Sequence, residues 1–221
     1  MMGKLILVRH GQTVANVAKI LDTAPPGAEL TELGHQQAES YAQTWVGHPP
    51  AVLVSSIALR AKQTAGYIER STGVPLVVTE GLQETYAGDM EGRDDPDAHR
   101  EFTEYFHRWH TGDLAATVPG GDSGNSVLER YVPVLDALRA QYLGDDTAGD
   151  VVVVSHGAAI RLVAAVLAGV DGTFAADNHL DNTQTVELLP LPDGGWACGK
   201  WGTFLPPFEG QGSEKADNPI S

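Results

Sequence analysis

The chain has 221 residues, 42% of them hydrophobic, which is enough to bury the core of one large domain. Its formal net charge of −15 disfavours a nucleic-acid partner, because proteins that bind nucleic acids present a basic face to the phosphates. Cys198 is the only cysteine, which excludes an intrachain disulfide and a zinc site of four thiolates. No apolar run approaches the roughly 18 residues of a membrane span, and the first one is too short for a signal peptide. We therefore expect a cytoplasmic protein with no membrane partner.

Short runs of branched apolar residues recur along the chain, and such runs are typical of strands that are covered on both faces. Segments with helical signals alternate with them. This alternation predicts an α/β fold with a mixed, mainly parallel sheet flanked by helices on both faces. The first four expected strands are residues 5–8, 51–54, 76–78 and 151–154.

Three helices are expected between and after these strands. The first begins after Thr31, and the second carries Arg60 in its first turn, with Ser55 or Ser56 as its N-cap. The third begins just after His156 with the sequence GAAIRLVAAVLAG. The Ser-Ser start is expected to aim the first turn of the second helix at the edge where the strands end.

Residues 94–143 interrupt this alternation. The aromatic side chains from Phe102 to Trp109 recur at helical spacing, and the loop PGGDSGNS leads to a second helical pattern. We interpret the segment as a helical lobe, inserted in the sheet domain, that closes over the functional site. The aromatic stripe is expected to pack the lobe onto the core and not to line a pocket.

Two further strands are expected beyond Asn182. The stretches TQTVELL and GWACGKW form a predicted hairpin that turns at Asp193-Gly194-Gly195. From residue 206 to residue 221 the composition is typical of a disordered tail. The folded domain is therefore expected to span residues 1–205.

Basic and polar residues stand where the expected strands end. Arg9, His10 and Gly11 follow the first strand, and His156 with Gly157 follows the fourth. In open α/β sheets, ligands sit beyond the carboxyl ends of the strands. We therefore expect these side chains to meet at one edge of the sheet, with Arg60 of the second helix beside them.

This combination of residue types points to phosphoryl transfer. The planar fork of arginine matches phosphate oxygens, and neutral histidine is a nitrogen nucleophile that nearby arginines keep unprotonated. A glycine after each histidine would let backbone N–H groups approach an anion. A carboxylic acid in EGLQETYAGDMEG would protonate the leaving alkoxide. The pattern predicts a covalent phosphohistidine, with no metal and no cofactor.

Five motifs in this order resemble the histidine phosphatase superfamily, also called the phosphoglycerate mutase-like family. The resemblance spans residues 5 to about 190. It implies that His10 is the phosphorylated nucleophile, that Glu84 is the proton donor, and that His156 is a second histidine at the phosphoryl group. The phosphate-binding residues are then Arg9, Asn16, Arg60 and Gly157. The motifs are LVRHGQT with Asn16, LTELGHQQA, VSSIALRAKQTA, LQETYAGDMEG and VSHG.

The sequence leaves the proton donor and the substrate open. Glu80, Asp89 and Glu91 lie close to Glu84 in the sequence and compete with it as the proton donor, and the sequence departs from the family pattern in two loops of the substrate side. Residues 17–30 read VAKILDTAPPGAEL, where the family usually has a Gln-Gly or Ser-Gly pair and then an Asp. Gly121-Asp122-Ser123 replaces Gly-Glu-Ser. Substrate identity and oligomeric state, a homodimer among the options, are left open.

The implied activity is a metal-independent phosphomonoesterase that acts on a small phosphorylated metabolite. A cofactor-dependent phosphoglycerate mutase would use the same core, but such mutases grip the substrate carboxylate with paired basic residues. No adjacent Arg-Arg or Arg-Lys pair occurs between Glu84 and His156, and Arg93, Arg100 and Arg108 are expected to form surface ion pairs. An inactive phosphate-binding module is disfavoured by the complete catalytic set. A housekeeping phosphatase with no single substrate also agrees with the sequence.

Overall fold

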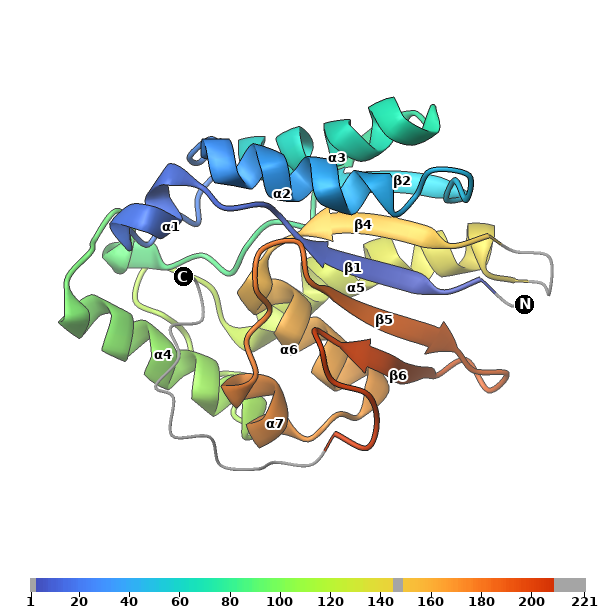
Figure 1. Cartoon of the computed structure of the whole chain (residues 1–221). Coiled ribbons are helices and arrows are strands. Elements are labelled where there is room, and N and C mark those ends of the chain that lie inside the picture. The colour runs from blue at the N-terminus through green and yellow to red at the C-terminus, as the bar shows by residue number, and fades with distance from the viewer. Residues whose placement is uncertain (1–2, 145–148, 209–221) are drawn as a thin grey trace.

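The computed structural model describes residues 3–144 and 149–208. Within them a six-stranded sheet lies at the centre of the molecule, in the order β3-β2-β4-β1-β5-β6 (Figure 1). Strands β1 to β4 are mutually parallel, and β5 runs antiparallel to both β1 and β6. The mixed, mainly parallel sheet predicted from the sequence is therefore confirmed. The strands are β1 Leu5–Arg9, β2 Val52–Ser56, β3 Leu76–Thr79, β4 Val151–Ser155, β5 Thr185–Pro190 and β6 Trp196–Trp201.

Helices cover both faces of the sheet, as predicted (Figure 1). Helices α2 and α3 pack on one face, and α4, α5, α6 and α7 pack on the other. The bounds are α1 Val14–Ala18, α2 Glu32–Gln43, α3 Leu59–Thr72, the 3-10 turn η1 Gly88–Met90, α4 Pro96–His110, α5 Gly124–Tyr142, α6 Gly157–Ala168 and α7 Gly172–Asp177.

The central strands contribute to two hydrophobic clusters, one on each face. In β1, Ile6 and Val8 belong to the cluster under α2 and α3, whereas Leu5 and Leu7 belong to the cluster under the other helices. Every residue of β1, β2 and β4 is buried. Burial on both faces explains why these strands are continuous apolar runs without alternation.

The segment 94–143 contains α4 and α5, and its core is shared with the sheet. Phe102, Phe106 and Trp109 are buried in the same cluster as Leu5 of β1. Their rings meet edge to face at centroid distances of 6.3 and 6.4 Å. The aromatic stripe therefore packs the segment onto the core, as expected. That the segment closes over the functional site stays a prediction.

One predicted helix start is confirmed and another is wrong. Thr31 caps α2, because its side chain accepts a hydrogen bond from Gly34 N–H. Neither Ser55 nor Ser56 caps α3, whose N-cap is Ala58. Parallel pairing with β3 keeps both serines inside β2, so the strand runs farther than its apolar residues suggest.

The C-terminal segment is described as far as residue 208. The ring of Phe208 packs against Phe174 of α7, with the ring centroids 5.3 Å apart. Residues 209–221 of the predicted tail lie outside the described residues. Among the helices of the described ranges, none combines the length and the apolar character that a membrane crossing requires.

Candidate active site

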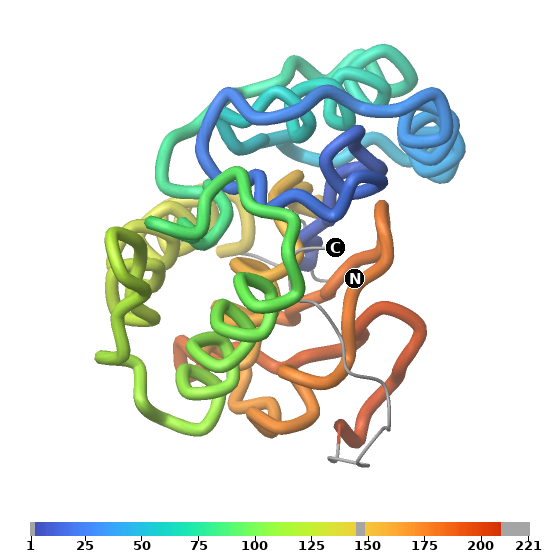
Figure 2. Tube along the Cα trace, turned by 90° about the vertical axis from the view of Figure 1, so that its left-hand side faces the viewer, coloured from blue at the N-terminus to red at the C-terminus, as the bar shows by residue number. Residues whose placement is uncertain are grey.

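The predicted site residues meet at the carboxyl edge of the parallel strands. Figure 2 looks onto this edge, where the segments that follow β1 and β4 lie side by side. Because Arg9 pairs in register with Ser155, the next residue on each strand is a histidine. The ring centroids of His10 and His156 are 5.2 Å apart. The sheet register thus brings two residues together that are 146 positions apart in the sequence (156 − 10).

Hydrogen bonds determine which nitrogen of His10 carries the lone pair. Nδ1 lies 2.8 Å from the carbonyl oxygen of Gly11, which can only accept, so Nδ1 carries the proton. Nε2 lies 3.2 Å from Nε of Arg60, which can only donate. His10 is therefore held as a neutral ring whose lone pair lies on Nε2 and accepts the N–H of Arg60.

In His156 the two ring nitrogens have the reverse roles: Nδ1 is the acceptor and Nε2 carries the proton. Its Nδ1 accepts from Nε of Arg60 at 3.2 Å, and its Nε2 lies 2.9 Å from Oγ of Ser56. The single N–H on Nε of Arg60 is therefore shared between two imidazoles. Ser56, expected as a helix cap, instead hydrogen-bonds the second histidine from inside its strand.

Burial and positive charge keep both imidazoles neutral. Burial lowers the pKa of His10 well below 6.5, and the charges of Arg60 and Arg9 lower it further. Burial, Arg60 and His10 do the same to the pKa of His156. Burial also lowers the pKa of Arg9 to about 10, so this guanidinium stays charged at neutral pH. The site thus combines cationic arginines with uncharged histidines.

The two neutral histidines predict a pH dependence of folding. Below about pH 6.5 the unfolded chain takes up protons on both rings and the folded chain does not, so the free energy of unfolding falls as the pH falls. The limiting slope is about 1.4 kcal/mol per pH unit for each histidine. Urea unfolding between about pH 7 and about pH 5 measures it. A double substitution of both histidines by glutamine should flatten the profile, and an unchanged slope would assign the effect to other groups.

Arg60 is held by the loop between α1 and α2. Its side chain is 2% exposed, and its Nη1 lies 3.3 Å from Oδ2 of Asp22. Gly27 lies against the guanidinium with a φ of +67°, and a Cβ at this position would collide with Nη1. Sequence reasoning missed both residues. The available signals were the Pro-Pro-Gly turn and the sole Asp of residues 17–30.

Arg9 is packed against the start of α6. Its Nη1 donates to the carbonyl oxygen of Leu180 at 2.5 Å, and its buried Nε has no hydrogen-bond partner among the described residues. A Cβ on Gly157 would lie 3.3 Å from Cδ and Nε of Arg9. Gly157 therefore makes room for this arginine, and its expected direct contact with phosphate stays a prediction.

Glu84 is seated at the N-terminus of α6. Its carboxylate accepts from Thr85 N–H at 2.8 Å, Ala158 N–H at 3.2 Å and Ala159 N–H at 2.8 Å. Two backbone donors that follow His156 therefore bind Glu84 of the protein, although we expected such groups to approach the substrate anion.

The competing carboxylates have other places in the structure. Asp89 is exposed, and Glu91 accepts hydrogen bonds from the backbone N–H groups of Thr23 and Ala24. Glu91 therefore fixes the loop that carries Asp22. Glu84 is the carboxylate of this segment that lines the cavity beside His10.

The described part of the chain forms a narrow cavity beside His10. Five of the seven predicted site residues line it, and His156 and Gly157 are not among its lining residues. Asn16 is oriented by a reciprocal pair of 3.0 Å hydrogen bonds with Thr13, the N-cap of α1. The lining residues are Arg9, His10, Thr13, Asn16, Ile20, Asp22, Arg60 and Glu84.

Residues 5–203 match the family model of the histidine phosphatase superfamily, branch 1. The chain belongs to the histidine phosphatase superfamily. This membership confirms the resemblance that the five sequence motifs carried, and the match covers nearly all of the sheet domain.

The chain is also similar to several known proteins and to a solved structure. The native structure of a mycobacterial glucosyl-3-phosphoglycerate phosphatase has a TM-score of 0.78 and 28% identity, over 91% of this chain and 99% of that one. A 2,3-bisphosphoglycerate-dependent phosphoglycerate mutase of Chelativorans sp. strain BNC1 is 35% identical, over 78% of this chain and 84% of the mutase. The PE-PGRS family protein PE_PGRS11 of Mycobacterium tuberculosis strain H37Rv is 28% identical over 88% of this chain, which spans 35% of that protein.

Proposed function

We propose that this chain is a phosphomonoesterase that transfers the phosphoryl group of a small phosphorylated metabolite to His10 and then to water. The observation that carries the proposal is the hydrogen bonding of His10, which puts the lone pair on Nε2 of a residue that lines a cavity together with two arginines. A relative named as a glucosyl-3-phosphoglycerate phosphatase supports the phosphatase assignment. The cytoplasmic location and the oligomeric state stay predictions.

In the first half-reaction the lone pair on Nε2 of His10 attacks phosphorus, and the bond between phosphorus and the alcohol oxygen breaks. A phosphoryl oxygen that takes the N–H of Arg60 frees this lone pair, which Arg60 holds in the resting site. Arg9 and Arg60 stabilise the charge on the phosphoryl oxygens, with His156 and Asn16 beside them. Glu84, in its protonated form, gives its proton to the departing alcohol.

In the second half-reaction water attacks the phosphorus of the phosphohistidine. Glu84, now a carboxylate, takes the proton of the water, and the bond between phosphorus and Nε2 breaks. Inorganic phosphate and neutral His10 result. The carboxylate is held for this role by its hydrogen bonds at the N-terminus of α6.

The arginines of α4 and its flanks favour the phosphatase over the mutase. Each forms a surface ion pair with an aspartate close to it in sequence, at 2.6 to 2.8 Å. None lines the cavity around His10. A mutase needs cations that grip the carboxylate of phosphoglycerate, and these arginines already have partners. The pairs are Arg93 with Asp95, Arg100 with Asp97, and Arg108 with Asp113.

Hydrolysis of p-nitrophenyl phosphate in the presence of EDTA tests the proposal. The nucleophile is an imidazole and not a metal-bound water, so the rate should be unchanged by the chelator. Acid quenching during turnover should destroy the enzyme-bound phosphoryl group, and alkaline quenching should preserve it on His10. Restoration of activity by an added divalent metal after chelation would contradict the proposal.

Replacement of Arg60 by alanine should lower turnover and weaken inhibition by orthovanadate, each by about tenfold or more, because charge-assisted donors to one anion are lost. Arg70→Ala is the matched control. Arg70 lies at the other end of α3, exposed, with its guanidinium 4.2 Å from the ring of Tyr67. Equal inhibition constants in the Arg60 variant and the control would remove Arg60 from the phosphate site.

A further inference from the structure

A second cavity adjoins the narrow cavity beside His10, and Glu84 lines both. Its volume is about 310 Å³, within the range of about 300 to 1,000 Å³ that is usual for small-molecule sites. Pro25 and the half-exposed ring of Tyr86 supply apolar surface, and Asp122 and Arg130 contribute charged groups. The proposed proton donor therefore stands between the phosphoryl site and a space large enough for the alcohol half of a substrate.

The cationic group of this second cavity, the guanidinium of Arg130, already has hydrogen-bond partners within the protein. Nη1 of Arg130 donates to the carbonyl oxygens of Gly81 at 3.0 Å and Gln83 at 2.7 Å. Nη2 donates to the carbonyl oxygen of Glu84 at 2.8 Å and to Asp122 at 3.0 Å. Arg130 thus positions the segment that carries Glu84. Its terminal N–H groups are not available to a substrate anion.

The other charged groups of the cavity are the carboxylates of Glu84 and Asp122. The carboxylate of Asp122 accepts from Tyr86 N–H, from Ser126 and from Arg130, and its charge faces the same space. Acceptors of this kind suit hydroxyl groups of a ligand, which can donate to them. A carboxylate or a second phosphate would find no free cationic donor here, because the terminal N–H groups of Arg130 are already used.

We infer, on the basis of the proposed function, that the second cavity binds the leaving group of the substrate. It selects phosphate esters of uncharged, hydroxyl-bearing alcohols over esters that carry a second anion. Sugar and polyol phosphates belong to the favoured class. Phosphoglycerates and bisphosphates belong to the disfavoured one. Tyr86 packs against the carbon skeleton, and Asp122 holds Arg130 so that it cannot pair with a second anion.

Glycerol 3-phosphate and 3-phosphoglycerate form a matched pair of probes, because they share a three-carbon skeleton and differ in a hydroxymethyl group against a carboxylate. We expect kcat/KM to be about tenfold or more higher for glycerol 3-phosphate. Asp122→Asn should shrink this ratio about threefold or more, since the amide weakens the hold on Arg130 and leaves its positive charge unbalanced beside the cavity. p-Nitrophenyl phosphate is assayed beside them as the measure of phosphatase activity itself.

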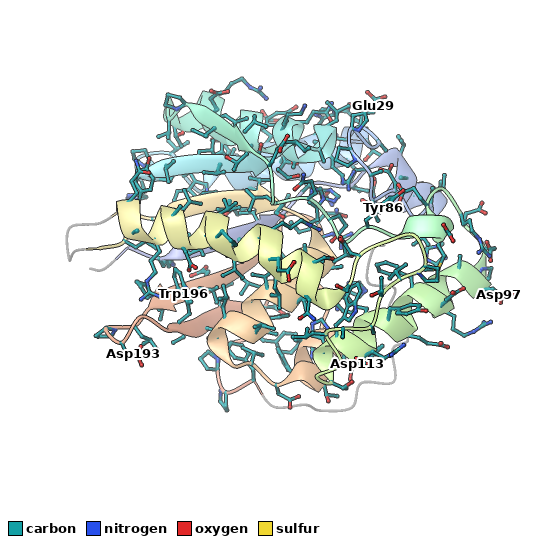
Figure 3. All side chains as sticks on the ribbon, turned by 180° about the vertical axis from the view of Figure 1, so that it is seen from behind. Glu29, Tyr86, Asp97, Asp113, Asp193 and Trp196 are labelled. Atoms are coloured by element: carbon teal, nitrogen blue, oxygen red, sulfur yellow. The ribbon has the colours of Figure 1, made fainter. Side chains whose placement is uncertain are left out.

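Asp113→Asn is the control for net charge. Asp113 pairs with Arg108 at the end of α4, and Figure 3 shows it well separated from Tyr86. This variant should keep the wild-type ratio. A ratio of one or below, no turnover of either alkyl ester, or an equal shift in both variants would overturn the inference while hydrolysis of the aryl ester continues. If the wild-type enzyme hydrolysed none of the three esters, the two alkyl phosphates and p-nitrophenyl phosphate, the result would instead contradict the proposed function.

Discussion

His10→Ala is expected to lower kcat for p-nitrophenyl phosphate by at least about a thousandfold, because no covalent intermediate can form without the imidazole. The neighbouring histidine cannot substitute for it. His156 is fully buried, and its Nδ1 and Nε2 are engaged by Arg60 and Ser56. The variant should also fail to take up labelled phosphoryl from the aryl ester.

His48→Ala serves as the control, since His48 is exposed, lies beyond α2 and does not line the narrow cavity beside His10. It should keep full activity. Far-UV circular dichroism and the Tm of the His10 variant establish that it is folded. A folded variant that retains a tenth of the activity would require another nucleophile.

Glu84→Gln should separate the two half-reactions. A phenolate such as p-nitrophenolate departs without a proton, so the variant should still phosphorylate His10 from the aryl ester. Hydrolysis of the phosphohistidine needs a base for water, which glutamine cannot supply. We therefore expect a burst of nitrophenolate that approaches one equivalent per enzyme, followed by a slow steady state. Alkyl phosphates should show no burst and a loss of about a hundredfold or more, because their alkoxides need the proton.

Asp89→Asn makes the same carboxylate-to-amide exchange five positions away (89 − 84) at an exposed residue, and it should behave as the wild type. Rapid-quench measurement of the first turnover shows whether the Glu84 variant produces the burst. Equal losses on aryl and alkyl esters with no burst would show that Glu84 does not carry the proton. Glu91, which holds the backbone of Thr23 and Ala24, would then be the next candidate.

The residues that end the parallel strands could be predicted from the sequence. Burial on both faces makes β1, β2 and β4 continuous apolar runs, and the polar residues that end such runs must lie at the ligand-binding edge. This reasoning located Arg9, His10 and His156 without knowledge of the strand order. Their chemistry then followed from the residue types.

The contacts of side chains in the loops could not be predicted from the sequence in this way. Asp22 and Gly27 contact Arg60 from a loop whose backbone at residues 23 and 24 is held by Glu91, more than sixty positions later. No local pattern encodes such a contact. The choice of Glu84 over Asp89 likewise depends on donors at the start of α6, which the chain reaches only after α5 and β4.

The sequence by itself determined the sheet class, the strand ends and the choice of histidine and arginine residues as candidates for the site, because these depend on local periodicity and residue chemistry. The tertiary structure alone decided three other features. Arg60 shares one N–H between two histidines, Ser56 belongs to the site and not to a helix cap, and Arg130 is committed to backbone carbonyls. Each is a contact between segments far apart in the chain, and its geometry arises only when the sheet register and the packing of the loops bring those segments together.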